Sequence, residues 1–184
     1  MGRRIQYKCC SFVPPAEFCF QKSALHNNYQ ECGCPAANQA AVKSLSLTLF
    51  RNRFAADVPP FSECPSDMRP GAFPDTLMLN TTGCRMGFDP LGFLRVTDAA
   101  LRDNLRGFQV DYYLEDKIGS LRAARSQCSF QTNFTLFRLS FAWITDGMLV
   151  NTSLLTADAD LESGWGALRG FVDSVRFEEK DGTR

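Results

Sequence analysis

The sequence has little histidine, no net charge and no long apolar run, and each shortage excludes a class of protein. Its 184 residues include 20 Lys+Arg and 20 Asp+Glu, so no overall charge draws the chain to nucleic acid. The longest apolar run, Phe137 to Ile144, is interrupted by Arg138 and Ser140, whereas a membrane-spanning helix needs about 20 consecutive apolar residues. We therefore expect neither a nucleic-acid partner nor a membrane span.

Signals for catalysis are equally scarce. His26 is the only histidine, and its place in a Cys-rich segment beside two asparagines does not suit the base of a nucleophilic site. Glycine-rich phosphate motifs and the G-x-S-x-G nucleophile motif are missing. We therefore predict that the protein is not an enzyme and has no catalytic residues. An enzyme is still one alternative: a glycoside hydrolase with paired carboxylates, for which the candidate residues are Asp111, Glu115, Asp173 and Glu178.

Cysteine is the unusual part of the composition. Five cysteines fall in the first 34 residues and three in the remainder, so complete pairing would need at least one bridge from the N-terminal segment to the body. We predict mostly disulfides, because the spacing contains no C-x-x-C and matches no zinc or iron–sulfur site. Reduced structural thiols and a four-Cys metal site remain the alternatives. The predicted disulfide cysteines are Cys9, Cys10, Cys19, Cys32, Cys34, Cys64, Cys84 and Cys128.

Three Asn-x-Ser/Thr sequences would permit glycosylation in an oxidising compartment. They begin at Asn80, Asn133 and Asn151. Asn and Thr are also common in turns and strands, which would produce the same pattern without any modification. Disulfides and glycans together would place the protein outside the cell or on an exposed assembly. Reduced cysteines would instead indicate an intracellular assembly.

The chain divides by composition into two parts. Residues 1–42 are predicted to form an irregular Cys-rich arm, and 43–184 a β-sandwich domain. Five of the nine prolines lie in 55–74, which predicts a long Pro-rich loop within the domain. Apolar and polar residues alternate from Ser44 to Leu49, which is the pattern of a half-buried strand.

Further strands are indicated by the same alternation. It predicts short strands over 76–79 and 92–96 and a longer one over 136–144. It also predicts a strand over 108–115, with Phe108, Val110, Tyr112 and Leu114 on its apolar face. Asp146-Gly147 between two apolar runs predicts a hairpin, because both turn positions need positive φ. One short helix is expected over 97–105, where a capping residue precedes good helix formers. Many strands and one helix favour an all-β antiparallel sandwich.

A last strand is expected over 170–179, with the sequence GFVDSVRFEE. This stretch resembles the closing strand of jelly-roll and galactose-binding-like lectin domains. The resemblance covers about ten residues. It implies a jelly-roll arrangement of the sandwich and transfers no binding residue.

An acidic segment and several aromatic residues are the candidate ligand contacts. In extended form, Asp158, Asp160 and Glu162 would share one side, and carboxylates so arranged can bind calcium. Apart from such a calcium ion, we expect no cofactor. The alternative is a solvated acidic loop. Trp165, between two glycines in an expected loop, could stack on a sugar or a partner, or cover the end of the sandwich. The predicted binding residues are Trp165, Tyr113, Phe12, Phe18, Phe20 and Phe61.

Long irregular segments without catalytic motifs are typical of a chain that docks onto others. We therefore expect a non-enzymatic structural or adhesive subunit that binds other protein subunits in a larger assembly. The first alternative is an extracellular jelly-roll module that binds glycans.

Overall fold

The computed structural model describes residues 4–7, 10–16, 18–20, 45–51, 75–84 and 88–177. Of the strand residues Tyr7, Cys19, Phe20 and 45–51, only Leu47 and Leu49 have described side chains. Most of the predicted Cys-rich arm lies outside this part of the chain, as do the Pro-rich loop at 55–74 and Glu178.

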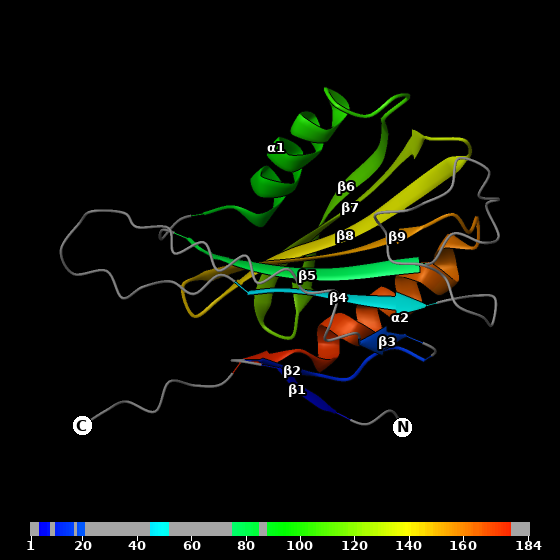
Figure 1. The fold of residues 1–184 in the computed structure, drawn as a ribbon. Helices are drawn as coiled ribbons and strands as arrows, with labels where there is room; N and C mark the ends of the chain where they lie inside the picture. Colours follow the sequence, from blue (N-terminus) through cyan, green and yellow to red (C-terminus); the bar gives the residue numbers. More distant parts are fainter. Residues whose placement is uncertain are drawn as a thin grey trace, which may run out of the picture.

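Within these described residues, ten strands form two antiparallel sheets, and two helices pack against them (Figure 1). The large sheet has the strand order β3-β4-β5-β9-β8-β7-β6, and the small sheet β1-β2-β10. In chain order the elements are β1 (Ile5–Tyr7), β2 (Cys10–Phe12), β3 (Cys19–Phe20), β4 (Leu45–Arg51), β5 (Asp75–Gly83), α1 (Pro90–Arg102), β6 (Gln109–Ile118), β7 (Leu121–Gln131), β8 (Thr135–Thr145), β9 (Met148–Thr156), α2 (Leu161–Ser174) and β10 (Arg176–Phe177).

The expectation of a mostly β, antiparallel fold is confirmed, but its finer form is not. A jelly roll packs two sheets of several strands against each other. Here one seven-stranded sheet has α1 on one face, and α2 with the small sheet on the other (Figure 1). We call these the α1 face and the α2 face. The helix expected over 97–105 is confirmed over 97–102 as part of α1, but the described chain has a second helix, α2, and the two have 13 and 14 residues.

The hairpin predicted at Asp146-Gly147 is confirmed. It joins β8 to β9, and both turn residues have positive φ, 49° at Asp146 and 71° at Gly147. The alternation predicted from Ser44 is confirmed as β4, in which Leu47 and Leu49 are fully buried. The alternation over 136–144 is confirmed as β8, but the face expected to be polar is buried too. Arg138 and Ser140 on that face are buried because α1 covers it.

Helix α1 begins earlier than the sequence analysis expected. Its N-cap is Asp89, whose carboxylate accepts hydrogen bonds from the backbone N–H groups of Leu91 and Gly92, and Pro90 follows as the first helical residue. The predicted strand over 92–96 was therefore wrong. Leu94 and Asp98 lie on one side of the helix and are both buried against the sheet.

The predicted strand over 170–179 was also wrong. Residues 170–174 belong to α2, and among the described residues of that stretch only Arg176 and Phe177 form a strand. Leu168, Phe171 and Val172 are buried at helical spacing, and this apolar side packs on β8 and β9. The first half of the stretch that resembles jelly-roll domains, residues 170–174, is therefore helical.

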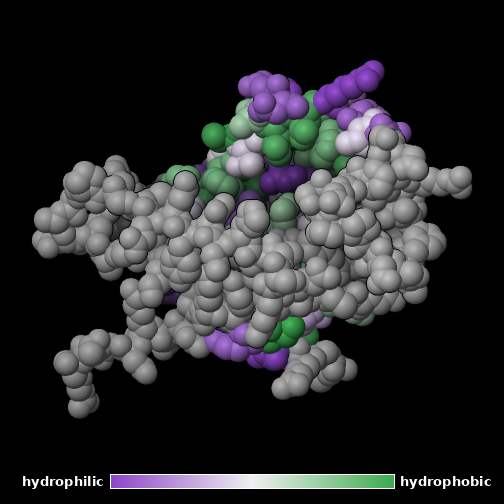
Figure 2. Space-filling view, in the orientation of Figure 1, coloured by the Kyte–Doolittle hydropathy of each residue, from purple (hydrophilic) through white to green (hydrophobic). Residues whose placement is uncertain are grey.

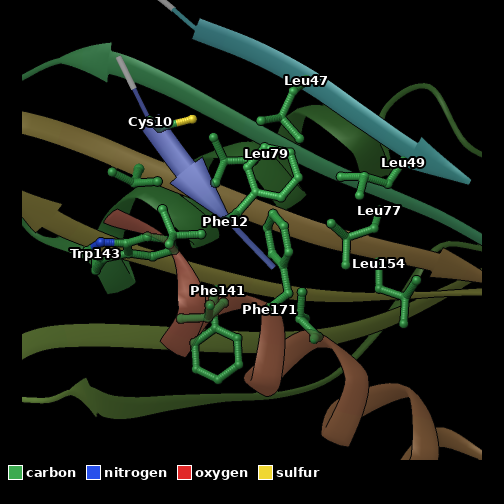
Figure 3. Close-up of a cluster of buried hydrophobic side chains, with 14 of the residues drawn as sticks. Cys10, Phe12, Leu47, Leu49, Leu77, Leu79, Phe141, Trp143, Leu154 and Phe171 are labelled. Carbon is green, nitrogen blue, oxygen red and sulfur yellow. The ribbon is translucent and has the colours of Figure 1, made fainter. Parts of the chain in front are cut away.

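The main core lies between the α2 face and α2. Leucines of β4 and β5 meet Phe141 and Trp143 of β8 and Leu154 of β9 there (Figure 3). Phe12 of β2 is fully buried and packs edge-on against Phe171, with 5.5 Å between ring centroids. Phe18 is also buried in this core. Neither Phe12 nor Phe18 is therefore available as the docking residue that the sequence analysis expected.

Candidate functional site

Strand β6 forms one edge of the large sheet. It has ten residues and pairs with β7 alone, and no other described strand lies along its outer side. Leu114, at its middle, is 43% exposed, which makes it one of three exposed large apolar residues in the described chain. The other two, Phe88 and Val96, belong to α1 or the segment before it. An edge strand leaves backbone N–H and C=O groups unpaired, so this edge can accept another strand.

A β-bulge between Val110 and Tyr112 decides which residues of β6 share a face. The sequence analysis expected Phe108 and Tyr112 on one side. Phe108 instead packs with Phe130 and Leu136 on the α1 face, while Tyr112 stacks on Trp165 of α2. Beyond the bulge, Tyr112 to Ile118 pair with β7 without a further break. The seven residues after the bulge are thus a regular edge.

Aromatic and arginine side chains support this edge from the α2 face. Tyr112 stacks on Trp165 at a centroid distance of 6.3 Å, and Phe141 meets the Trp165 ring edge-on at 5.5 Å. The guanidinium of Arg125 lies 5.4 Å over the same ring. The Trp165 Nε1–H donates to Oε1 of Gln127 at 3.0 Å, and the Gln127 amide donates to Asp111 at 2.7 Å. We call these residues the Trp165 cluster.

Ion pairs complete the attachment of β6 to α2. Arg169 of α2 donates to Asp116 at 3.3 Å and to the backbone carbonyl of Lys117 at 2.9 Å. Arg125 lies 3.6 Å from the same Asp116 carboxylate. Burial opposes the charged form of Arg169, but its hydrogen bond to Asp173 and the nearby carboxylates outweigh this, so its pKa is raised. The charge of Asp116 is therefore met by two cations, and the edge is held in place.

A buried polar group lies beneath α1 on the opposite face. Arg138 of β8 donates to Asp98 of α1 at 2.6 Å, and both side chains are buried. Burial, with a further contribution from the Asp98 carboxylate, raises the pKa of Tyr113 to about 12. Burial also raises the pKa of Cys128 to about 11. These groups keep their protons at neutral pH, which suits a structural contact more than proton transfer.

The predicted binding residues occupy places that sequence spacing did not show. Trp165 lies on helix α2 and not in a loop, and it is half-buried against the sheet. Tyr113 lies on the α1 face, where Arg95 stands 5.6 Å over its ring. The Phe20 side chain and Phe61 lie outside the described residues.

The acidic segment before α2 caps that helix. Asp160 is its N-cap and accepts from the backbone N–H of Ser163 at 3.2 Å. The Asp158 carboxylate accepts from the N–H of Asp160 at 3.0 Å, and Glu162 lies in the first helical turn. The described residues include no group of three or more His, Cys, Asp or Glu that could hold a metal ion. Calcium binding at Asp158, Asp160 and Glu162 stays a prediction.

Three of the eight cysteines have described side chains, and no disulfide joins any two of them. Cys128 is a buried thiol that donates to the carbonyl of Arg138 at 3.8 Å, and Cys84 is a half-buried thiol 3.6 Å from the carbonyl of Gly147. Cys10 is fully buried in the core. The other five cysteines have side chains outside the described part of the chain: Cys9, Cys19, Cys32, Cys34 and Cys64.

The three Asn-x-Ser/Thr asparagines differ in exposure. Asn133 is exposed in the turn between β7 and β8, where a glycan would meet little obstruction. Asn80 is exposed on β5, directly opposite Asn151 of β9. Asn151 is half-buried, and its side-chain oxygen is enclosed without a hydrogen-bond partner in the described chain. Glycosylation stays a prediction for all three.

Leu114, Arg125 and Arg169 were missed by the sequence analysis. Arg125 lies on β7, a strand that was not predicted, and Arg169 on α2, a helix that was not predicted. Leu114 was assigned to an apolar face that the bulge then divided. Apolar and polar residues alternate from Phe108 to Tyr112 without a break, so the sequence carries no signal of the bulge.

Comparisons with known proteins identify a fold and no family. The chain matches no protein-family model and no curated protein. Among solved structures, it is similar to cyanobacterial PsbP (CyanoP) from Synechocystis sp. PCC 6803, with a TM-score of 0.55 and 8% identity over 96% of this chain and 92% of that one. It is also similar to LpqN of Mycobacterium tuberculosis, a protein involved in cell envelope biogenesis, with a TM-score of 0.51 and 16% identity over 92% and 83%.

A third similar structure comes from Bacteroides thetaiotaomicron, with a TM-score of 0.53 and 10% identity over 97% of this chain and 49% of that one. At such identities these similarities concern the fold alone. No described helix has the length and apolar character needed to cross a bilayer.

Proposed function

We propose that this protein is a non-enzymatic subunit that binds another polypeptide through the outer edge of β6. One-sided pairing of this ten-residue strand carries the proposal. Adding a strand to a sheet edge is a recurring mode of peptide recognition, in which backbone hydrogen bonds supply affinity and alternate side chains supply specificity.

The surroundings of the edge support binding. Trp, Tyr and Arg are the residues most enriched where proteins bind one another, and the Trp165 cluster places all three beside β6. Charged residues and bulges also keep edge strands from pairing. Here the bulge is confined to the N-terminal end, and Asp116 is already paired with two arginines. The middle of the edge, at Leu114, is apolar and exposed.

Glycan binding and hydrolysis have no such support. The Trp165 ring already contacts Tyr112, Arg125 and Phe141, which leaves little of it for a sugar. Asp111 is engaged by Gln127 at 2.7 Å and Glu115 by Arg122 at 3.4 Å. The glycan-binding jelly roll and the paired-carboxylate hydrolase stay predictions.

A photo-cross-linking residue at position 114 tests the proposal in the cell that makes the protein. The control carries the same residue at Val96, which is 72% exposed and belongs to helix α1 instead of the edge strand. We expect the Leu114 variant to give cross-linked polypeptides, identified as peptides by mass spectrometry, and the Val96 variant to give far fewer. Equal yields at the two positions, or none at 114, would overturn the proposal.

A further inference from the structure

We propose that the polypeptide that pairs with β6 is a second copy of this chain, aligned antiparallel with a two-fold axis at Leu114. This inference depends on the proposed function and names its partner. A two-fold axis perpendicular to the sheet would join the two large sheets into one and keep α1 of both copies on the same side. Residues that face each other across the axis then lie on the same face of the joined sheet.

With the axis at Leu114, the side chains of the edge are complementary to themselves. The exposed Leu114 faces Leu114 of the second copy, and mutual contact would remove both from water. Tyr112 faces Asp116 of the second copy, whose charge is already met by Arg125 and Arg169. Tyr113 faces Glu115 of the second copy. No two like charges meet directly across this interface.

The neighbouring registers are less favourable. Moving the axis to Glu115, Asp116 or Lys117 places that charged residue directly opposite the same residue of the second copy. Like charges directly opposite each other are destabilising. Moving it to Tyr113 puts Asp111 against Glu115 of the second copy. Moving it to Tyr112 puts the bulge at the axis, where the hydrogen-bond ladder would be interrupted. Of the registers with the axis at residues 112–117, all of which place opposing residues on the same face of the joined sheet, only the one at Leu114 combines a regular hydrogen-bond ladder with compatible charges.

The exposed residues that the structure describes outside this edge offer less for pairing. Figure 2 shows apolar and polar side chains mixed over the α1 end of the molecule. There, Val96 and Phe88 are exposed, and Phe88 already contacts Phe93 at 6.4 Å between ring centroids. One strand pair with its flanking side chains is a small interface, so we expect a dissociation constant on the order of micromolar.

Sedimentation velocity of the full chain over a concentration series, from about 1 to about 300 µM, measures the association. We expect a monomer–dimer equilibrium for the native chain. Leu114→Lys places two cations at the axis and should weaken association at least about tenfold. Val96→Lys makes the same change at an exposed position on α1 and should leave association unchanged. Circular dichroism confirms that both variants are folded.

Cysteine substitutions test the register itself. The two copies of Leu114→Cys would have Cβ atoms about 4.5–5.5 Å apart, close to the reach of a disulfide. The two copies of Lys117→Cys would be offset by six residues, or about 20 Å. We expect oxidation to give a reducible dimer with Leu114→Cys, above the background of the native chain, and no such increase with Lys117→Cys.

Three results would overturn the inference: a monomer at every concentration, equal effects of Leu114→Lys and Val96→Lys, or equal cross-linking at 114 and 117. The proposed function can survive such a failure. If the native chain is monomeric but position 114 photo-cross-links to a different polypeptide, β6 binds a partner other than itself. If position 114 cross-links to nothing, both proposals fail.

Discussion

Arg138 and Asp98 show how one contact can fix a helix to a sheet. Their side chains are 9% and 0% exposed, and they join strand β8 to helix α1 across 40 positions in the sequence. Removing a charge from water is costly, and each ion here relies on the other to offset that cost. Breaking the pair from one side should therefore be worse than removing it altogether.

Asp98→Ala should lower the free energy of unfolding by about 3–5 kcal/mol, because it leaves the Arg138 cation buried without its counter-ion. The double variant Asp98→Leu with Arg138→Met replaces both charges by apolar groups and should lose less than Asp98→Ala does. Urea unfolding followed by circular dichroism measures all three chains. A double variant that is less stable than Asp98→Ala would contradict this account.

At the scale of the element, helix α2 carries three glycines that do not play the same part. A Cβ on Gly164 would lie 3.0 Å from Leu139 Cδ1 and 3.5 Å from Leu154 Cδ2, so this glycine lets the helix approach the sheet closely. A Cβ on Gly166 or Gly170 would meet nothing within 4 Å. These two positions lower helix stability without a packing benefit in the described chain.

Gly166→Ala and Gly170→Ala should each raise the free energy of unfolding by about 0.5–1 kcal/mol through helix propensity. Gly164→Ala gains the same propensity but must displace Leu139, so its net effect should be smaller than that of the other two, or negative. Thermal unfolding of the three single variants ranks them. Equal stabilisation by all three would show that α2 is not held closely against β8.

At the scale of the whole molecule, the N-terminal strand β2 and the C-terminal helix α2 share one core. Phe12 is fully buried against Phe171, and β2 pairs with β10 directly after α2. The Ser174 hydroxyl accepts from the backbone N–H of Val13 at 2.9 Å, which adds a second connection. This part of the predicted arm is therefore integral to the fold.

Phe12→Ala should lower the free energy of unfolding by about 3–5 kcal/mol, as expected for an aromatic side chain lost from a packed core. Val96→Ala, at an exposed position on α1, should stay within about 0.5 kcal/mol of the native chain. Chemical denaturation monitored by tryptophan fluorescence distinguishes the two, since Trp143 lies in the same core as Phe12. If the two variants were equally stable, Phe12 would belong to a dispensable arm.

The candidate site was only partly accessible from sequence. Trp165 and Tyr113 were both singled out, but their neighbours Arg125 and Arg169 come from elements that the patterns did not predict. β7 lacks an alternation of large apolar residues because the residues that it buries on the α1 face, such as Ala124 and Ser126, are small or polar. The glycines of α2 suggested a loop, whereas close packing on β8 and β9 favours a helix there.

The sequence by itself determined the features that depend on neighbouring residues. Positive φ at Asp146-Gly147 and the alternating apolar residues of β4 and β8 are local, so they could be read correctly. Tertiary structure alone decided that both faces of β8 are buried, that 170–174 are helical and that β6 lies at an edge. Each of these depends on which distant segment supplies the covering surface, and burial against that segment outweighs local preference.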